Sequence, residues 1–266
     1  MEREIIQTLD GSTTIHLKEW DECYHSKHGA IQEAQHVFIK NGLTLFENKS
    51  VSILEIGFGT GLNAFITFLE TLNLSSTPTA AIKFIKYSDR LRDLDISNTK
   101  IEDISELANL TNLQVFKASN TSIQSFAVLN QFKGLKTLDL NESGFNTIEN
   151  IKDLTVLENL SLRKNYILNY SLLSKLSSLI SLDLSETNFE DLSPVSSMTN
   201  LVYLDITACN ISDLSPITSL KSLKKIAADE TKISQEDATL FVRNHPEILL
   251  IHHVKDLQSW WESLSM

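Results

Sequence analysis

Hydrophobic side chains recur along most of this chain with a fixed period of 22 residues. Seven leucines mark the first position of each period: Leu91, Leu113, Leu135, Leu157, Leu179, Leu201 and Leu223. Within a period, apolar residues also occupy positions 4, 6, 11, 14, 17 and 20, as the run from Leu91 to Leu110 illustrates. A fixed period of this length is typical of an array of stacked units. We therefore expect seven stacked units from about residue 90 to 233.

The pattern inside one unit predicts its local structure. Apolar residues at positions 4 and 6 alternate with a polar one, which predicts a short strand, and the later spacing of three predicts a tight helical or 3-10 return. Burying seven apolar side chains contributes about 14 kcal/mol, whereas ordering 22 residues costs roughly 22 to 44 kcal/mol. A single unit is therefore unstable alone, and each one depends on its neighbours.

Position 9 carries a small side chain, most often one that forms hydrogen bonds: Thr99, Thr121, Ser143, Asn165, Thr187, Cys209 and Thr231. Such a side chain can bond the backbone where the chain leaves the strand. Together with this position, the phrases Leu91–Ile101 and Asp213–Ile217 resemble the internalin-like class of bacterial leucine-rich repeats. The resemblance covers more than half of the chain. It implies an α/β fold, a horseshoe-shaped solenoid with a parallel β-sheet on its concave face.

In such arrays the concave face usually carries the function, and positions 3, 5, 7 and 8 face outward there. The predicted partner-binding residues are mainly acidic: Asp95, Asp139, Glu142, Asp183, Glu186, Tyr203 and Asp205. Adjacent parallel strands lie about 4.8 Å apart, so Asp183 and Asp205 should repel each other by about 0.9 kcal/mol even in water. One interpretation is an acidic ladder for a basic protein partner. The other is that aspartate between the strand leucines simply keeps the surface hydrated.

The fourth unit departs from the pattern, because Tyr170 stands at position 14, where neighbouring units carry Ile, Phe or Leu. The alternatives are a local bulge, a tyrosine that faces a partner, and a repacked core position, and we favour the last. The concave face also has a few apolar residues, Val115, Val202 and Tyr203, which are too sparse to define a binding hot spot.

Residues 234–266 are expected to cap the last unit. Ser234 can begin a helix that Pro246 ends, and Ile248–Ile251 can form a closing strand. Trp260 and Trp261 are expected to fold over the final layer. Because His252 and His253 should alternate in direction along the strand, we predict no metal site there.

A glycine-rich loop lies upstream of the repeats, between an expected strand at 51–56 and an expected helix at 62–72. Glycines at a helix N-terminus let the backbone approach an anionic ligand closely. The phrases 9–14, 19–20, 24–33, 36–39 and 53–63 are similar to the start of the bacterial tRNA wobble-uridine methyltransferases that complete 5-methylaminomethyl-2-thiouridine. This resemblance covers roughly residues 5 to 75.

The methyltransferase resemblance implies S-adenosylmethionine binding by the glycine loop. The cofactor-site candidates are Glu55, Gly57, Gly59, Gly61 and Asp89, with Tyr24, Ser26 and Glu33 as weaker neighbours. Asp89 would follow a second strand at 82–87 and bind the ribose. However, the repeats begin within two residues of Asp89, and no catalytic motif follows. We therefore predict no catalytic residue, and we identify residues 1–81 as a truncated, Rossmann-like methyltransferase segment.

Parallel sheets are normally covered on both faces, so this segment needs a partner surface. We expect the strand at 82–87 to join the edge of the repeat sheet, where the segment would shield Leu91 and Leu94. The predicted organisation is then the N-terminal segment at 1–81, leucine-rich repeats at 82–233 and a C-terminal cap at 234–266.

The net charge of −11 is spread along the chain: Lys and Arg number 8 against 11 Asp and Glu in residues 1–90, and 15 against 23 in the rest. Without a basic cluster, a nucleic-acid partner is disfavoured. Two cysteines suit a reducing compartment. Neither a secretory signal nor a run of about 18 apolar residues occurs, so we expect a monomer in the cytoplasm, away from membranes.

Three functions remain open. The first is a module for protein–protein interaction without complete catalytic machinery. The second is an S-adenosylmethionine-dependent tRNA methyltransferase, or a remnant that still binds the cofactor. The third is a chimeric chain, whether a natural fusion, recombined or designed. No cofactor is expected unless the glycine loop is functional.

Overall fold

The computed structural model of the chain describes residues 3–7, 13–17, 22–23, 71–78, 82, 85 and 90–253. The chain divides into two compact units, Met1–Glu70 and Thr71–Met266. In the first unit, a three-stranded antiparallel sheet has the order β1-β2-β3, formed by β1 (Arg3–Gln7), β2 (Thr13–Leu17) and β3 (Glu22–Cys23).

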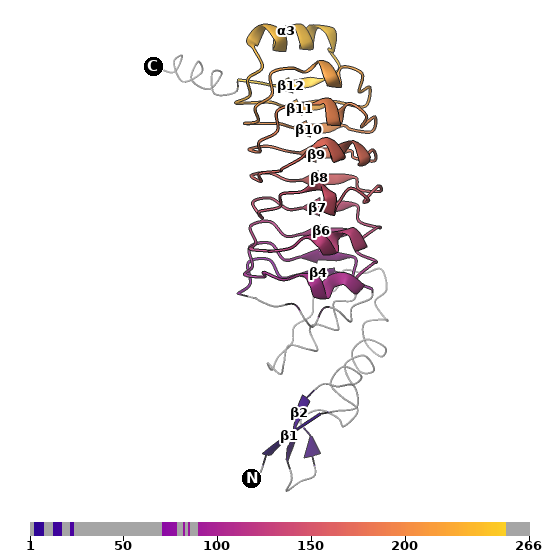
Figure 1. Cartoon of the computed structure of the whole chain (residues 1–266), viewed down its shortest axis with the longest axis vertical. Coiled ribbons are helices and arrows are strands. Elements are labelled where there is room, and N and C mark those ends of the chain that lie inside the picture. Colours follow the sequence, from indigo (N-terminus) through magenta and orange to yellow (C-terminus); the bar gives the residue numbers. More distant parts are fainter. Residues whose placement is uncertain are drawn as a thin grey trace, which may run out of the picture. The chain divides into compact units, whose positions relative to one another are not determined.

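The second unit is built on a parallel sheet of nine strands that follow one another in sequence order (Figure 1). The strands are β4 (Thr71–Asn73), β5 (Asp93–Asp95), β6 (Val115–Lys117), β7 (Thr137–Asp139), β8 (Asn159–Ser161), β9 (Ser181–Asp183), β10 (Tyr203–Asp205), β11 (Lys225–Ala227) and β12 (Leu249–Ile251). Equivalent positions pair across the sheet, as Leu182 does with Leu204. The predicted leucine-rich-repeat solenoid with its open parallel sheet is confirmed.

Short 3-10 helices return the chain to the start of the next strand, as the spacing of three predicted. They are η4 (Ser105–Asn109), η5 (Ala127–Gln131), η6 (Ile148–Asn150), η7 (Ser171–Lys175), η8 (Ser193–Val195) and η9 (Ser215–Ile217). Pro194 and Pro216 lie in the first turn of η8 and η9. Proline is tolerated there because the first N–H groups of a helix have no partner within it.

The core lies between the strands and the returns. All seven leucines that define the period are at most 1% exposed. Phenylalanine rings pack edge to face between neighbouring repeats, with centroids 5.3 Å apart for Phe126 and Phe145. Tyr170 is half-buried with its ring centroid 4.7 Å from that of Phe189, and its hydroxyl donates to Asn188 Oδ1 at 2.9 Å. It therefore fills its core position, as favoured from the sequence.

A repeated corner ends each strand. At position 9 the side chain donates to the carbonyl oxygen three residues earlier, as Thr99 Oγ1 does to Ile96 at 2.7 Å and Thr187 Oγ1 to Leu184 at 2.6 Å. Cys209 is the exception, because its thiol donates to the Leu184 carbonyl oxygen of the preceding repeat at 2.9 Å. The preceding residue adopts a positive φ of 51° to 59° in every repeat: Ser76, Asn98, Asn120, Glu142, Lys164, Glu186, Ala208 and Glu230. The sequence predicted the position 9 hydrogen bond but not the left-handed backbone beside it.

The array contains one more turn than the seven predicted. β4 pairs with β5 in the same register as the later strands, with Leu72 opposite Leu94. Thr77 Oγ1 donates to the Leu74 carbonyl oxygen at 2.7 Å, which repeats the position 9 bond 22 residues upstream of Thr99. Ile82 and Ile85 are at most 1% exposed and occupy positions 14 and 17 of this turn.

Two local predictions are therefore wrong. The expected helix at 62–72 cannot run to its end, because Thr71–Asn73 is a strand. The expected strand at 82–87 is also wrong, because Ile85 lies in a 3-10 turn and its N–H donates to the Ile82 carbonyl oxygen at 3.0 Å. The two buried isoleucines are spaced three residues apart, which is the spacing of a 3-10 return and not the two-residue alternation of a strand. The strand that joins the edge of the repeat sheet is β4.

The helix and the closing strand of the C-terminal cap form as predicted. Helix α3 (Gln235–Asn244) begins at Ser234, whose Oγ accepts the Asp237 N–H at 3.0 Å, and Phe241 is buried against the last layer. β12 then closes the sheet beside β11. Trp260 and Trp261 lie outside the described residues.

The expected orientation of the two histidines after β12 is wrong. The strand ends at Ile251, so the rings of His252 and His253 do not point to opposite faces, and their centroids lie 3.9 Å apart. Within the described part of the chain, no three His, Cys, Asp or Glu residues cluster in a way that could hold a metal ion.

Candidate functional site

The outward face of the sheet carries the predicted partner-binding residues. At positions 3 and 5 of most strands, half-exposed side chains flank the buried residue at position 4. Asp183 and Asp205 lie directly opposite each other on β9 and β10. Ser161 on β8 separates them from Asp139, and Lys117 on β6 separates Asp139 from Asp95. The acidic ladder is therefore interrupted, and one adjacent pair remains.

The position 5 aspartates have a role within their own repeats. The carboxylate of Asp183 accepts the Ser185 N–H at 2.9 Å, and Asp205 accepts the Thr207 N–H at the same distance. Asp95 and Asp139 do the same for the residue two positions later. This is an Asx turn, which satisfies a backbone donor where the strand ends.

Repeats without an aspartate at position 5 satisfy the same donor in another way. The Ser119 N–H donates to Ser97 Oγ at 3.2 Å, and the Arg163 N–H donates to Asn141 Oδ1 at 2.8 Å, so the acceptor comes from the preceding repeat. In β4 the acceptor is the amide oxygen of Asn73. A side chain therefore accepts the position 7 N–H in every repeat from β4 to β10. Sequence reasoning gave the aspartates a partner-binding or a hydrating role and missed this bond.

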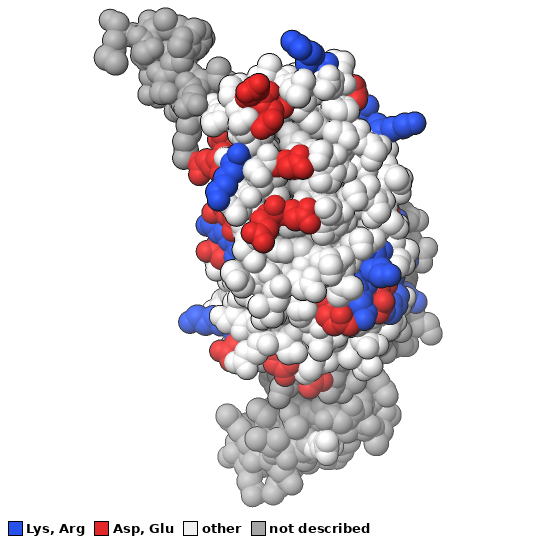
Figure 2. Space-filling model, turned by 45° about the horizontal axis from the view of Figure 1, so that its top comes forward, with Lys and Arg blue, Asp and Glu red and all other residues white. Residues whose placement is uncertain are grey.

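Glu142 and Glu186, at position 8 of their repeats, are paired with basic residues. The Lys164 ammonium lies 3.6 Å from Glu142 and 3.9 Å from Glu186, and the Arg163 Nε donates to Glu186 at 2.7 Å. The hydrogen bond that Arg163 donates to Glu186 raises the pKa of the Arg163 guanidinium. By contrast, Asp183 and Asp205 form no ion pair with any described residue. Charged side chains form small separate groups on the surface in Figure 2, with uncharged surface between them.

Tyr203 lies beside the aspartate pair. Its hydroxyl donates to Asp205 Oδ2 at 2.9 Å, and the Lys225 ammonium lies 5.1 Å from the centre of its ring. Burial, followed by the hydrogen bond to Asp205, raises the pKa of the tyrosine. The ring is therefore held between a cation and a carboxylate, as a rigid part of the surface.

A groove of about 400 Å³ runs along the start of strands β8 to β10, and the sequence did not predict it. Its lining includes three exposed branched apolar side chains, namely Val156 (45% exposed), Ile180 (41%) and Val202 (36%). At position 2, the first four repeats carry polar residues: Arg92, Gln114, Lys136 and Glu158. The change from polar to apolar at this position is the signal that could have revealed the groove. We call it the flank groove.

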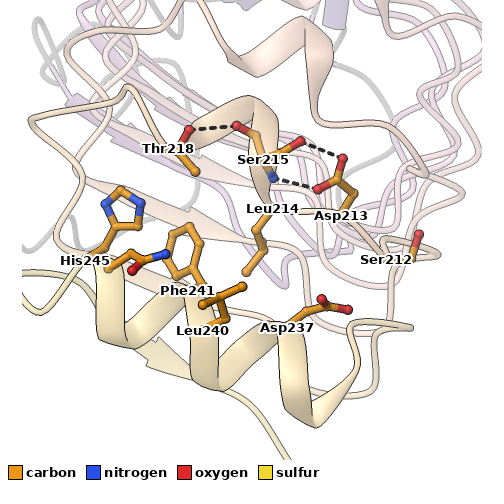
Figure 3. A pocket seen from close by; sticks show the side chains of 10 residues that line it. Ser212, Asp213, Leu214, Ser215, Thr218, Asp237, Leu240, Phe241 and His245 are labelled. Carbon is orange, nitrogen blue, oxygen red and sulfur yellow. Dashed lines mark hydrogen bonds between the residues drawn. The ribbon is translucent and has the colours of Figure 1, made fainter.

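A second hollow, of about 380 Å³, lies between η9 and α3 (Figure 3). The two aspartates that line it accept hydrogen bonds from residues two or three positions away in sequence. Asp213 accepts the Ser215 N–H at 2.8 Å and the Ser215 hydroxyl at 2.7 Å, and these bonds hold the pKa of Asp213 below its ordinary value. Asp237 belongs to the start of α3. This hollow marks the joint between the last repeat and the cap.

The predicted cofactor site lies outside the described residues. This applies to Glu55, Gly57, Gly59, Gly61 and Asp89, and to their weaker neighbours Tyr24, Ser26 and Glu33. Binding of S-adenosylmethionine therefore stays a prediction.

The parallel sheet with its short returns is the fold of an internalin-like leucine-rich-repeat solenoid. The family described as Leucine Rich repeats (2 copies) matches residues 177–219. The chain is similar to internalin C2 of Listeria monocytogenes strain 4b F2365, with 26% identity and a TM-score of 0.63 over 68% of this chain and 80% of that one. No curated protein sequence matches the chain significantly.

Two further solved structures share the fold. Internalin F of the same Listeria strain is 27% identical, with a TM-score of 0.59 over 71% of this chain and 62% of that one. A leucine-rich-repeat protein of Leptospira interrogans is 24% identical, with a TM-score of 0.59 over 69% of this chain and 48% of that one. The chain thus spans less than two thirds of the length of these two proteins. None of the helices in the described residues has the length and apolar character to cross a membrane.

Proposed function

We propose that the chain is a protein-interaction module that binds its partner on the outward face of the repeat sheet. The observation that carries this proposal is the adjacent pair of aspartates on β9 and β10, neither of which forms an ion pair within the described residues. Tyr203 adds a rigid aromatic ring beside them. Leucine-rich-repeat proteins generally bind protein partners, and the similarity to internalins supports the same role here.

The remaining predicted contact residues fit the rim of such a surface. Asp95 and Asp139 lie on β5 and β7, farther along the sheet. Glu142 and Glu186 are already paired with Arg163 and Lys164. Ion pairs at an exposed rim change the association rate more than the affinity. We therefore assign the aspartate pair and Tyr203 to the centre of the interface.

Capture of a partner by the full-length chain tests the proposal. The double variant Asp183→Asn/Asp205→Asn removes two negative charges but keeps an acceptor oxygen for each corner, as Asn73 shows on β4. We expect the variant to lose a partner that the unmodified chain retains. The matched control is Asp95→Asn, which should retain it. Equal capture by all three proteins would refute binding through the aspartate pair.

A second candidate function rests on the sequence of the N-terminal unit. The motif Glu55-Ile-Gly57-Phe-Gly59-Thr-Gly61 supports S-adenosylmethionine binding, in a methyltransferase acting on tRNA or in a remnant of one. Isothermal titration of the full chain with S-adenosylmethionine tests it. Heat that disappears in Gly59→Asp would favour this function, and the absence of heat in the unmodified chain would remove it.

We also propose that the chain acts as a cytoplasmic monomer. The composition supports this, because Cys23 and Cys209 are far apart in sequence and Cys209 is a buried free thiol. Sedimentation equilibrium of the full-length chain should give a mass near 29.9 kDa. A dimer mass would contradict the proposed monomer.

A further inference from the structure

We infer that the flank groove receives a branched or linear aliphatic side chain of the protein partner, while a neighbouring Lys or Arg of the same partner segment reaches the pair Asp183 and Asp205. This inference rests on the proposed function, because it specifies the chemistry of the segment that the sheet would bind. The groove lies at the start of β9 and β10, and the aspartate pair lies at the end of the same two strands.

The apolar character of the groove is confined to one stretch of the array. Ile180 and Val202 stand at position 2 of the fifth and sixth repeats, and Val156 is the last residue of the third repeat. All three are more than a third exposed although they are branched aliphatic residues. Ser178, Asn200 and Ser222 add uncharged polar groups to the lining, and Glu158 adds a carboxylate. A concave apolar site with a few polar groups at its edge suits an aliphatic side chain.

The strands fix the distance from the groove to the aspartates. Ile180 precedes Asp183 by three residues and Val202 precedes Asp205 by three, along neighbouring parallel strands. At about 3.3 Å per residue, each separation is about 10 Å. In an extended partner segment, side chains two residues apart lie about 6.6 Å apart on the same face. A long Lys or Arg side chain spans the remaining distance.

The charges around this surface favour a basic residue of the partner at β9 and β10. Asp183 and Asp205 form no ion pair with the described residues, whereas Glu158, which lines the groove, is paired with Lys136 at 3.2 Å. Lys225 covers the ring of Tyr203 on the side of β11. A cation is therefore repelled from β11 and attracted to β9 and β10. This arrangement favours a segment of the form aliphatic-x-basic lying along the strands.

Methyl NMR of the full-length chain, labelled at Ile and Val methyl groups, tests the inference with three synthetic peptides at millimolar concentration. The peptides carry Leu-Ser-Lys, Leu-Ser-Glu or Ser-Ser-Lys between identical Gly-Ser flanks. We expect Leu-Ser-Lys to shift the methyl signals of Ile180 and Val202 with at least fivefold tighter binding than the other two. Equal binding of the three peptides, no shift, or shifts only elsewhere would overturn the inference.

Variants separate this inference from the proposed function. Ile180→Ser/Val202→Ser should weaken binding of the Leu-Ser-Lys peptide at least fivefold, as should Asp183→Asn/Asp205→Asn. The control Leu168→Ser, at a side chain 72% exposed that does not line the groove, should leave binding unchanged. If a partner captured by the chain depends on the aspartates but not on Ile180 and Val202, the groove has no role while the proposed function stands. If capture is independent of the aspartates, the proposed function itself fails.

Discussion

Replacing Asp183 separates its structural role from its charge. In Asp183→Ala, the Ser185 N–H loses its acceptor in a residue that is only 6% exposed. A buried donor without a partner costs about 1 to 3 kcal/mol. Removing the charge also relieves repulsion from Asp205, which is worth at most about 0.9 kcal/mol in water and less with salt. We therefore expect a net loss of about 1 to 2 kcal/mol in the free energy of unfolding.

Asp183→Asn should behave differently, because its amide oxygen can accept the same N–H. Asn73 already forms this bond on β4, with the Ser75 N–H at 2.8 Å. The free energy of unfolding should stay within about 0.5 kcal/mol of the unmodified chain, the range of a neutral surface change. Urea unfolding followed by circular dichroism measures both variants, with an unchanged slope as the sign that the same surface is exposed.

The control for these variants is Lys117→Ala, at the same position of an earlier repeat. The corner N–H of that repeat, which belongs to Ser119, is bonded to Ser97 and not to Lys117. Lys117→Ala should therefore cost clearly less than Asp183→Ala. If the Ala and Asn variants of Asp183 lose equal stability, or if Asp183→Ala loses none, the corner hydrogen bond does not contribute as argued.

Three further predictions follow from the same repeat geometry. Ile82→Ala should lower the free energy of unfolding by about 2 to 5 kcal/mol, like Ile104→Ala one repeat later, because both side chains are fully buried. If urea unfolding shows unchanged stability for the Ile82 variant, the β4 turn lies outside the cooperative array. Ala208→Gly should stabilise the chain by about 0.5 to 1 kcal/mol, since φ is +57° there, and a lowered urea midpoint would contradict this. The pKa of Asp213 is lower in the folded chain than its unfolded value of 3.8, so the ionised carboxylate stabilises the fold above pH 3.8. This stabilisation is lost as the pH falls through the pKa of the folded chain. Asp213→Asn should therefore be less stable than the unmodified chain at pH 7, with the difference closing in thermal unfolding below about pH 4.

Much of the repeat fold could be predicted because its determinants are local and periodic. The leucine at position 1 and the hydrogen-bonding side chain at position 9 recur with little variation, so strand, corner and return follow from the sequence. The helix of the cap could also be predicted, since Ser234 and Pro246 mark the two ends of α3. The pairing of β1 and β2 was missed, although Asp10-Gly11 between two β-branched stretches is a hairpin signal.

The first turn and the binding surface were harder to predict for physical reasons. Around residues 62–72 a helical spacing overlaps the start of a repeat, and pairing of β4 with β5 decides between them. The flank groove depends on apolar residues of different repeats, whose proximity is created by stacking. The role of Asp183 in its corner also required the structure, because the same hydrogen bond can be supplied from the preceding repeat, as Asn141 does for Arg163.

The left-handed corner recurs every 22 residues from Ser76 to Glu230. A genetic deletion or duplication of one whole period therefore joins two equivalent corners, and the residues on either side of the seam meet the neighbours for which they were already suited. An excision that is one residue longer or shorter would instead rotate the buried leucines out of register. The area of the sheet can thus grow or shrink in steps during evolution, without any redesign of the units that remain.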